Sequence, residues 1–320
     1  RLDRPVLQAG MGGGLSGSAL AAAVSRAGGL GTLGITSPRR LVAEVRRVRE
    51  LSPGRPLAVN LLLQFMRASH IDACIAEKVD AVVLFFGFDA RAVSRLRGAG
   101  IVVLHQVGTA VEVRRAVADG ADVIVAQGLE AGGHLLGTKS AATFLPEALD
   151  AAAGRPVILA GGVADARDVR AALAAGAAGV LCGSRFLLTT ECRAHPGYKL
   201  RVLGATATIE TMLFGVGWPA RHRVVPNAAT DRWCATDGTP RLWVRALARA
   251  TSALGRVAPL DRHGSVAGLQ RVAVPLFGPE AALEGADPRS LDVTPLYAGE
   301  CVRRIHAIVS AEDAVRELAP

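Results

Sequence analysis

Eight short apolar runs, each followed by a segment with helix signals, constrain the fold of this 320-residue chain more than any other feature. Runs rich in Val, Ile and Leu are typical of strands buried on both faces of a parallel sheet. Strict alternation of strands and helices implies right-handed crossovers, and a count of eight favours an α/β fold closed into a (β/α)8 TIM barrel. The expected strands are residues 4–9, 30–35, 56–61, 81–85, 101–104, 122–125, 156–160 and 179–182.

The segments between these runs carry recognisable helix starts and stops. Ser37-Pro38 places a cap before proline, Thr109 precedes Glu112 in a capping-box pattern, and Asp165 is a further cap. Gly120 and Gly176 follow the last periodic positions, as helix-ending glycines do. The expected helices are residues 16–27, a helix from 37, then 70–79, 89–97, 109–120, 140–153 and 165–176.

The alternation ends near residue 195, which predicts a second structural unit. We expect a barrel over residues 1–200, a smaller helical, lid-like subdomain over 201–288, and a C-terminal helix over 289–320 that packs back on the barrel. Within the subdomain, residues 206–214 and 242–254 are predicted to be helices. Trp218 and Trp233 fall in the loop-rich stretch between them. A cover over the barrel mouth would make both tryptophans less exposed when substrate binds.

Composition excludes several classes of function. The net charge of +9 comes mostly from dispersed arginines, without interleaved aromatics, so nucleic-acid binding is not favoured. Five cysteines with no Cys-x-x-Cys spacing indicate a reduced, cytoplasmic protein. No apolar run is long enough to cross a bilayer, so no membrane association is expected.

The loop after the sixth expected strand is the first candidate for an active site. It reads Ala126-Gln-Gly-Leu-Glu-Ala-Gly-Gly-His134. Gly132 and Gly133 permit a close approach of backbone to a ligand, and His134 is the side chain whose charge is most easily tuned near neutral pH. The alternative is a simple turn that carries a surface histidine.

Two glycine turns follow the seventh and eighth expected strands. Gly161-Gly162 and Gly183-Ser184 lie where barrels of this class bind phosphate through backbone N–H groups. A ligand anchored there would extend across the barrel mouth toward Met11 and Asn60. Ordinary glycine turns are the alternative. The sequence contains no nucleotide-binding P-loop motif, no convincing set of metal ligands and no Gly-x-Ser-x-Gly after a strand.

Taken in order, several motifs resemble the nitronate monooxygenase family, formerly called 2-nitropropane dioxygenases. The motifs are Gln8-Ala9-Gly10-Met11-Gly12-Gly13, Gly28-Gly29-Leu30-Gly31-Thr32-Leu33-Gly34, Val59-Asn60, residues 126–134, Ala160-Gly161-Gly162-Val163-Ala164-Asp165 and Gly183-Ser184-Arg185-Phe186-Leu187. A weaker resemblance continues through Trp218-Pro219, Arg223, Asn227, Trp233 and Tyr297-Ala298-Gly299-Glu300. Two departures stand out: Gly10 replaces the family's usual proline, and Leu135-Leu136 follow the histidine.

The resemblance implies an FMN-dependent barrel and assigns roles to residues. Met11, Gly12 and Asn60 would hold the flavin ring and ribityl chain, and Gln127 would touch the flavin. Gly162, Gly183 and Ser184 would bind its phosphate, and Gly132 would lie against the ring. Gln106 and Gly161, at the ends of their strands, complete the cofactor-binding set. His134 would be the catalytic base or the partner of the nitro group.

The implied activity is oxidation of alkyl nitronates by O2. One alternative within the resemblance is an FMN-dependent enoyl-thioester reductase that uses NAD(P)H. A flavin oxidoreductase recruited to a biosynthetic pathway is another. From the residues alone, a flavin-free barrel that binds a phosphorylated metabolite, as an isomerase or a binding protein, stays open. The partners expected are a small-molecule substrate and O2, and a homodimer is a possible assembly.

Overall fold

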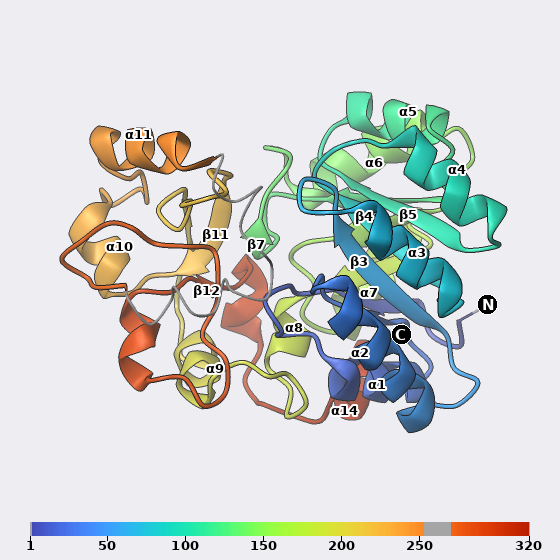
Figure 1. The fold of residues 1–320 in the computed structure, drawn as a ribbon, viewed down its shortest axis with the longest axis horizontal. Helices are drawn as coiled ribbons and strands as arrows, with labels where there is room; N and C mark the ends of the chain where they lie inside the picture. Colours follow the sequence, from blue (N-terminus) through green and yellow to red (C-terminus); the bar gives the residue numbers. More distant parts are fainter. Residues whose placement is uncertain (1, 253–269, 320) are drawn as a thin grey trace.

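The barrel predicted from the alternation is present. The computed structural model describes residues 2–252 and 270–319, and its larger part is an eight-stranded parallel sheet ringed by helices (Figure 1). The strands are β1 (Val6–Gln8), β2 (Gly31–Leu33), β3 (Leu57–Leu62), β4 (Ala81–Phe85), β5 (Val102–Val107), β6 (Val123–Gln127), β8 (Val157–Ala160) and β9 (Gly179–Cys182). Their spatial order is β1-β9-β8-β6-β5-β4-β3-β2. One parallel bridge between Leu7 of β1 and Leu30, which directly precedes β2, connects the two edges of this sheet and closes the barrel.

The apolar runs form strands because both faces of the sheet are covered. All six residues of β3 are buried, as expected for a strand between a filled barrel interior and a layer of helices. The interior is packed by alternate residues from successive strands, among them Leu7, Val83, Val125 and Leu181. The barrel is therefore a solid core that can support a site only at its ends.

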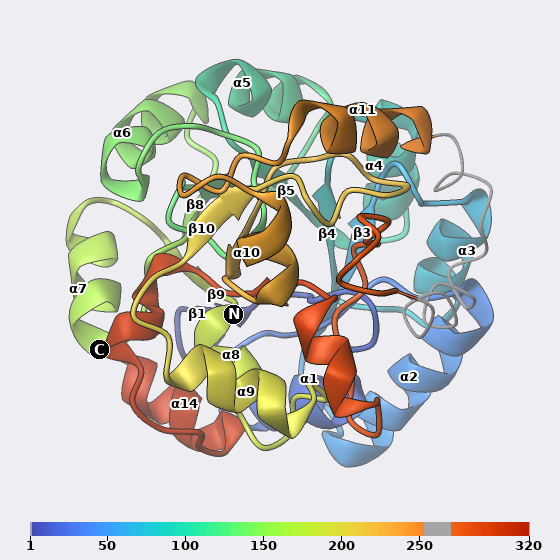
Figure 2. The same ribbon diagram turned by 90° about the vertical axis from the view of Figure 1, so that its left-hand side faces the viewer.

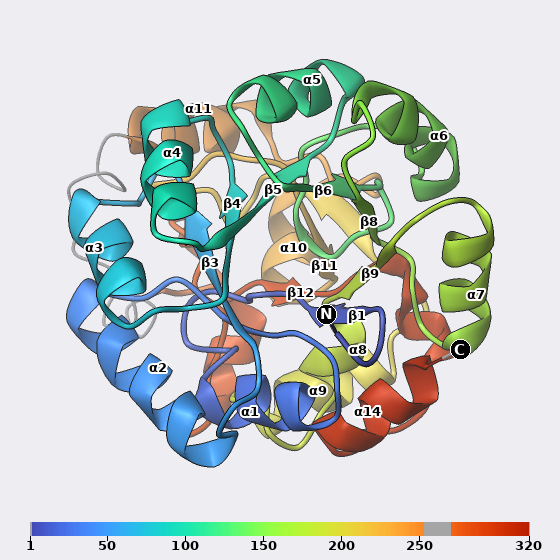
Figure 3. The same cartoon turned by 90° about the vertical axis from the view of Figure 1, so that its right-hand side faces the viewer.

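A helix follows each barrel strand, and all but the last, a single turn after β9, lie in a ring outside the sheet (Figure 3). They are α1 (Ser18–Arg26), α2 (Pro38–Leu51), α3 (Ala68–Ala76), α4 (Ala90–Gly98), α5 (Ala110–Ala118), α6 (Ala141–Ala151), α7 (Ala166–Ala174) and the short α8 (Ser184–Leu187). Two of the predicted caps are confirmed: Thr109 accepts from the backbone N–H of Glu112, and Asp165 from those of two residues in the first turn of α7. Ser37 directly precedes α2, but its side chain makes no capping hydrogen bond. Gly120 and Gly176 have positive φ angles of 97° and 98°, which end α5 and α7.

The eighth position of the helical ring is filled from the far end of the chain. α8 is a single turn, and α14 (Ala311–Leu318) packs beside α1, α7 and α8 (Figures 2 and 3). Its buried face carries Ala311, Ala314, Val315 and Leu318. The C-terminal segment thus ends in a helix that lies against the barrel helices.

The region beyond residue 195 is only partly helical, which corrects the expectation of a helical subdomain. It begins with α9 (Pro196–Leu203) and forms a small sheet in which β10 (Ile209–Thr211), β11 (His222–Val225) and β12 (Leu296–Tyr297) are antiparallel neighbours. The remaining elements are α10 (Ala228–Trp233), α11 (Leu242–Ala250), and the 3-10 helices η2 (Pro288–Asp292) and η3 (Glu300–Arg304). A separate apolar cluster that includes Phe214, Trp233 and Phe277 holds this region together.

Three local predictions in this region were wrong. Residues 206–214 contain β10 in place of a helix, because three residues paired to β11 gain their hydrogen bonds across the sheet. Trp233 closes α10 and does not lie in a loop. The C-terminal helix expected over 289–320 is not continuous, because this stretch forms two 3-10 helices, extended segments and α14. The helix predicted over 242–254 ends at Ala250, and residues 253 and 254 lie outside the described residues.

Figure 2 shows the small sheet, α10 and α11 in front of the ring of barrel helices. This region covers one end of the barrel. A two-residue strand, β7 (Gly133–His134), links the two parts: it follows β6 of the barrel and pairs with β11 of the cover. Within the described ranges, no helix is both long and apolar enough to cross a membrane.

Candidate active site

A cavity of about 600 Å³ lies between the carboxyl ends of the barrel strands and the cover. Such a volume suits a cofactor or a drug-sized ligand. Every position selected from the sequence lines it. These positions are Met11, Gly12, Asn60, Gln106, Gln127, Gly132, His134, Gly161, Gly162, Gly183 and Ser184. The structure thus brings these residues together around one cavity, while their roles stay predictions. Asn60, Gln106 and Gln127 lie inside their strands, in the carboxyl-terminal halves, and not in the loops that follow.

One end of the cavity is walled by the two predicted glycine turns. Gly161 and Gly162 have φ angles of 106° and 78°, a conformation that disfavours any residue with a Cβ. A Cβ on Gly183 would find its nearest neighbour, the Cβ of Ala9, at 3.8 Å, so there is open space in front of this residue. The Oγ of Ser184 accepts a hydrogen bond of 2.8 Å from the backbone N–H of Gly299.

The glycine turn after β8 is held from outside by an arginine of η3. The guanidinium of Arg304 donates to the carbonyl of Gly162 at 2.7 Å and pairs with the carboxylate of Asp168 at 2.8 Å. Asp168 in turn accepts from the N–H of Ala164 at 2.7 Å. Burial is the largest single effect and favours the neutral carboxyl, but the hydrogen bonds from Arg304 and from the backbone, together with the charge of Arg304, outweigh it and lower the pKa of Asp168 below its usual value.

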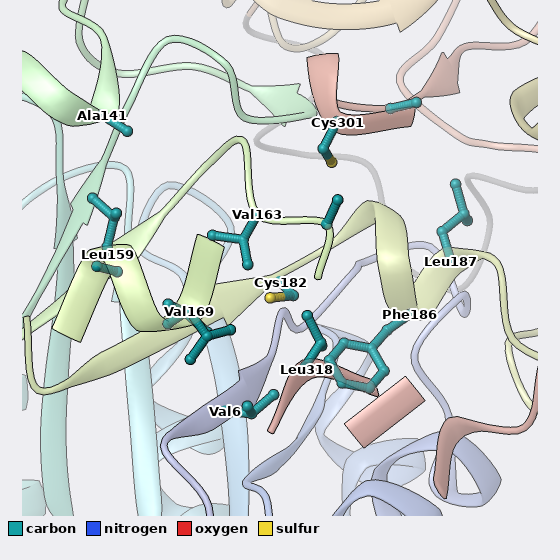
Figure 4. Packing of buried hydrophobic residues seen from close by; sticks show 14 of the residues in the cluster. Val6, Ala141, Leu159, Val163, Val169, Cys182, Phe186, Leu187, Cys301 and Leu318 are labelled. Atoms are coloured by element: carbon teal, nitrogen blue, oxygen red, sulfur yellow. The ribbon is translucent and has the colours of Figure 1, made fainter. Parts of the chain in front are cut away.

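Apolar packing supports the same loops from below. Figure 4 shows Val163 and Val169 near Cys182 of β9, with Phe186 and Leu318 beneath and Cys301 of η3 above. The thiols of Cys182 and Cys301 are both buried, and burial raises their pKa values, so neither is a reactive thiolate. These loops are therefore fixed before any ligand arrives.

The middle of the cavity is bordered by the loop after β1. The side chain of Asn60 donates to the carbonyl of Gly10 at 2.9 Å, while its Oδ1 is buried without a partner among the described residues. A Cβ on Gly10 would overlap the Cβ of Asn60. Glycine in place of the family's proline therefore permits this close approach of the two segments.

Gln8 fixes the same loop, a role that was not predicted although Gln8 opens the first of the family motifs. Its side chain is fully buried, donates to the Oγ of Ser16 at 2.8 Å and accepts from the N–H of Thr32 at 2.9 Å. Ser16 also accepts from the N–H of Met11 at 3.0 Å. A glutamine that ends an apolar strand resembles any polar boundary residue, which explains why it was missed.

His134 lies at the other end of the cavity and is 9% exposed, which contradicts the alternative of a surface histidine. As part of β7 it pairs with His222 of β11. Gln127 holds its backbone: the amide of Gln127 donates to the carbonyl of His134 at 2.9 Å and accepts from the N–H of Leu136 at 3.0 Å. The Nε2 of His134 is buried without a partner in the described part of the chain.

The imidazole of His134 is surrounded by aromatic rings from distant segments. The indole of Trp218 stacks on it with the ring centroids 3.5 Å apart and the planes 9° apart. The rings of His222 and Tyr297 are 5.2 and 5.4 Å away. Burial, with a smaller effect from His222, lowers the pKa of His134 well below its usual value. His134 is therefore neutral at physiological pH and able to accept a proton.

The roof of the cavity comes from residues 279–297, where sequence reasoning placed no site residue. The hydroxyl of Tyr297 donates to the carbonyl of Pro279 at 2.9 Å, and burial raises the pKa of the neighbouring Glu280 to about 7. A second titratable group thus borders the cavity, and only the folding of the cover back over the barrel brings it there. No group of three or more potential metal ligands occurs in residues 2–252 or 270–319.

The fold and this cavity define a (β/α)8-barrel protein whose site lies at the carboxyl end of the strands, as in other enzymes of that architecture. More particularly, the chain belongs to the nitronate monooxygenase family, whose model matches residues 2–77 and 66–233. The family predicted from the motifs is thereby confirmed.

Curated relatives carry two kinds of name. The chain is 37% identical over 238 residues to the (3aS,4S,5R,7aS)-5-hydroxy-7a-methyl-1-oxo-octahydro-1H-indene-4-carboxyl-CoA dehydrogenase of Mycobacterium tuberculosis, across 72% of this chain and 65% of that protein. A nitronate monooxygenase of Pseudomonas aeruginosa is 34% identical over 260 residues, across 64% and 72%. The chain spans only 65% and 54% of the dehydrogenases of M. tuberculosis and Rhodococcus jostii.

Solved structures agree with this placement. A nitroalkane oxidase from Streptomyces ansochromogenes superposes with a TM-score of 0.77 at 25% identity, covering 99% of this chain and 95% of that one. FabK from Thermotoga maritima gives a TM-score of 0.76 at 26% identity, covering 99% and 92%. The similarity extends over the cover as well as the barrel.

Proposed function

We propose that this protein is an FMN-dependent oxidase of alkyl nitronates that uses O2. The observation that supports this most directly is the presence, in one cavity, of a glycine-lined end with open space and a neutral, buried histidine whose Nε2 lacks a partner. Family membership supports the same reaction class.

The residues present fit an FMN. Gly161, Gly162, Gly183 and Ser184 would hold its phosphate through backbone N–H groups, and the open space in front of Gly183 leaves room for the anion. Asn60, whose buried Oδ1 lacks a partner in the described residues, and Met11 would border the ring, together with Gln106 and Gln127. Bound there, FMN supplies the redox chemistry, and the protein supplies orientation and electrostatics.

His134 is the residue we assign to the substrate. Its neutral ring can accept the α-proton of a nitroalkane, which converts it to the nitronate. A nitronate that binds already deprotonated needs only a hydrogen-bond partner. Its negative charge would raise the pKa of His134 and favour donation from the ring. The aromatic surroundings exclude water from this proton transfer.

The visible spectrum of the purified protein is the first test. A yellow protein that releases one FMN per chain on denaturation, loses its colour when mixed anaerobically with the nitronate of nitroethane, and regains it with O2 meets the proposal. A colourless preparation that does not take up added FMN would contradict it. Loss of colour with NADPH but not with nitronate would instead identify a reductase.

A second candidate is oxidation or reduction of a thioester substrate by the same cavity. Its specific support is the 37% identity to a protein named as a carboxyl-CoA dehydrogenase. An enoyl-thioester reductase needs NAD(P)H, so consumption of NADPH with an enoyl-CoA, and no turnover of nitronate, would favour this candidate over the first.

A further inference from the structure

We propose that Trp218 is a positioning residue for His134: its indole fixes the plane of the imidazole and shuts water away from one face. This inference rests on the proposed role of His134 and extends it to the cover. It assigns to the segment after β10 a direct part in the chemistry at the barrel mouth.

The stacking is close and nearly parallel. The ring centroids of Trp218 and His134 are 3.5 Å apart and their planes differ by 9°. Two nearly parallel rings with centroids this close have little lateral offset, so the indole covers one face of the imidazole. A ligand can then meet His134 only at its ring edge or on the opposite face.

Trp218 is itself held rigidly. The rings of Phe65 and Phe86 meet the indole edge-on, with centroids 5.3 and 5.0 Å away. Its backbone N–H donates to Gly215 at 3.0 Å, and its carbonyl accepts from Ala220 at 2.8 Å. With 8% of its surface exposed, the indole has little room to turn. A side chain fixed on this many sides can orient a neighbour.

His134 needs such a partner because its own chain does not set the ring plane. Gln127 fixes the backbone carbonyl of His134, but the χ2 torsion, which turns the ring about its bond to Cβ, can take a broad range of values. No hydrogen bond to either ring nitrogen is present in the described residues that could set the plane instead. The stack with Trp218 is the contact that does so.

The indole also controls the charge of the ring. Burial is the main cause of the low pKa of His134, and His222 of β11 adds to it by opposing a second positive charge. Tyr297 of β12 is the other titratable ring that faces it, and burial holds that phenol neutral. Removal of the indole would admit water, so the pKa of His134 would rise.

The test compares Trp218→Leu, Trp218→Phe and Trp233→Phe in the flavin-loaded protein. Trp233 is an equally buried tryptophan of the cover that contacts Trp243, and so it is the matched control. The pKa of His134 is followed by NMR on histidine-labelled protein and assigned by its absence in His134→Asn. We expect Trp218→Leu to raise that pKa by about one unit or more, a modest part of the 3–5 units that full burial can produce.

The same variant should lower kcat/KM on neutral nitroalkane about 10-fold or more, through kcat and not KM, since misorientation of a base affects the chemical step. Trp218→Phe, which keeps an aromatic face, should recover most of the loss, and Trp233→Phe should match the parent in both measurements. A folded Trp218→Leu protein with an unchanged pKa and pH profile would overturn the inference.

An NMR measurement on the unaltered protein tests the stack independently, in case the Trp218→Leu variant does not fold. The ring protons of His134 should be shifted upfield by the indole ring current, and their absence from that shifted region would refute the stack. If the shift and the pKa change are found but no nitronate is oxidised, the positioning role stands and the proposed function fails.

Discussion

The two ends of the cavity are built by different means. The glycine end is made of backbone: Gly161, Gly162, Gly183 and Ser184 come from two loops after adjacent strands, β8 and β9. The histidine end is made of side chains from four separated segments, which contribute Phe86, His134, Trp218 with His222, and Tyr297. A site made of backbone depends on local turns, whereas a site made of side chains depends on how distant parts of the chain meet.

The two ends also differ in the interactions that stabilise them. At the glycine end, positive φ angles and missing Cβ atoms create the space, and Arg304 and Asp168 only secure it. At the histidine end, stacking and burial set both the orientation and the charge of one imidazole. Substitutions should therefore affect cofactor retention at the first end and chemistry at the second.

The largest effect is expected at Gly183. Gly183→Asp would place a carboxylate beside the phosphate of FMN, and two like charges about 4 Å apart repel by about 4 kcal/mol at an effective dielectric of about 20. Flavin affinity should fall about 10³-fold, measured by fluorescence titration of the apoprotein. Gly183→Ala is the control: the residue has φ −101° and a Cβ there has room, so FMN should still bind. Full retention in the aspartate variant would place the phosphate elsewhere.

The next largest effect is expected at His134. His134→Asn should lower kcat/KM on neutral nitroethane by about 10²-fold or more, the usual scale for loss of a positioned base. Activity on the nitronate should fall much less, because only a hydrogen-bond partner is altered. FMN content should stay unchanged if the two ends are independent. Equal losses on both substrates would remove the assignment of His134 as a base.

A smaller effect is expected from the ion pair between Asp168 and Arg304, which supports the glycine turn after β8. Asp168→Asn removes the nearer of two carboxylates that pair with Arg304, the other being Asp165 at 3.5 Å. Because the side chains of Asp168 and Arg304 are partly exposed, the loss of stability should be about 1 kcal/mol. The pKa of Asp168 is lowered from 3.8, so its contribution is present above that pH and disappears as the pH falls below it. The difference in Tm between variant and parent should therefore be full at pH 7 and narrow below about pH 3.8. A difference that persists unchanged in acid would show that the ion pair is not its source.

The smallest effect concerns the cover. The sequence suggested that Trp218 and Trp233 become less exposed when substrate binds, but each is only 8% exposed already. Hydrogen exchange of residues 215–220 and 230–234 should change little at saturating nitronate. Strong new protection there would mean that the cover opens widely in the free protein, and the histidine end would then be assembled only on binding.

The comparison also explains what the sequence could predict. The position of Gly161 and Gly183 depends on short turns, and that of Gln127 on the strand it ends. Neighbouring residues determine such turns and strands, so all three positions could be placed at the cavity from their spacing alone. Trp218 could not, since its contact with His134 joins residues 84 positions apart in the numbering and leaves no periodic signal. The strand β10 was misread as a helix because its pairing with β11 outweighs the local preference of a three-residue segment.

The placement of α14 in the helical ring has a consequence for synthesis of the chain on the ribosome. The gap between α7 and α1 is filled by a helix that follows the entire cover, so residues 188–310 must emerge before the barrel wall is complete. Until then, the apolar surfaces of α1 and of Phe186 that α14 covers are open to water and to other chains. A growing chain of this kind is thus most in need of a chaperone late in translation, after every strand of its barrel has already been made.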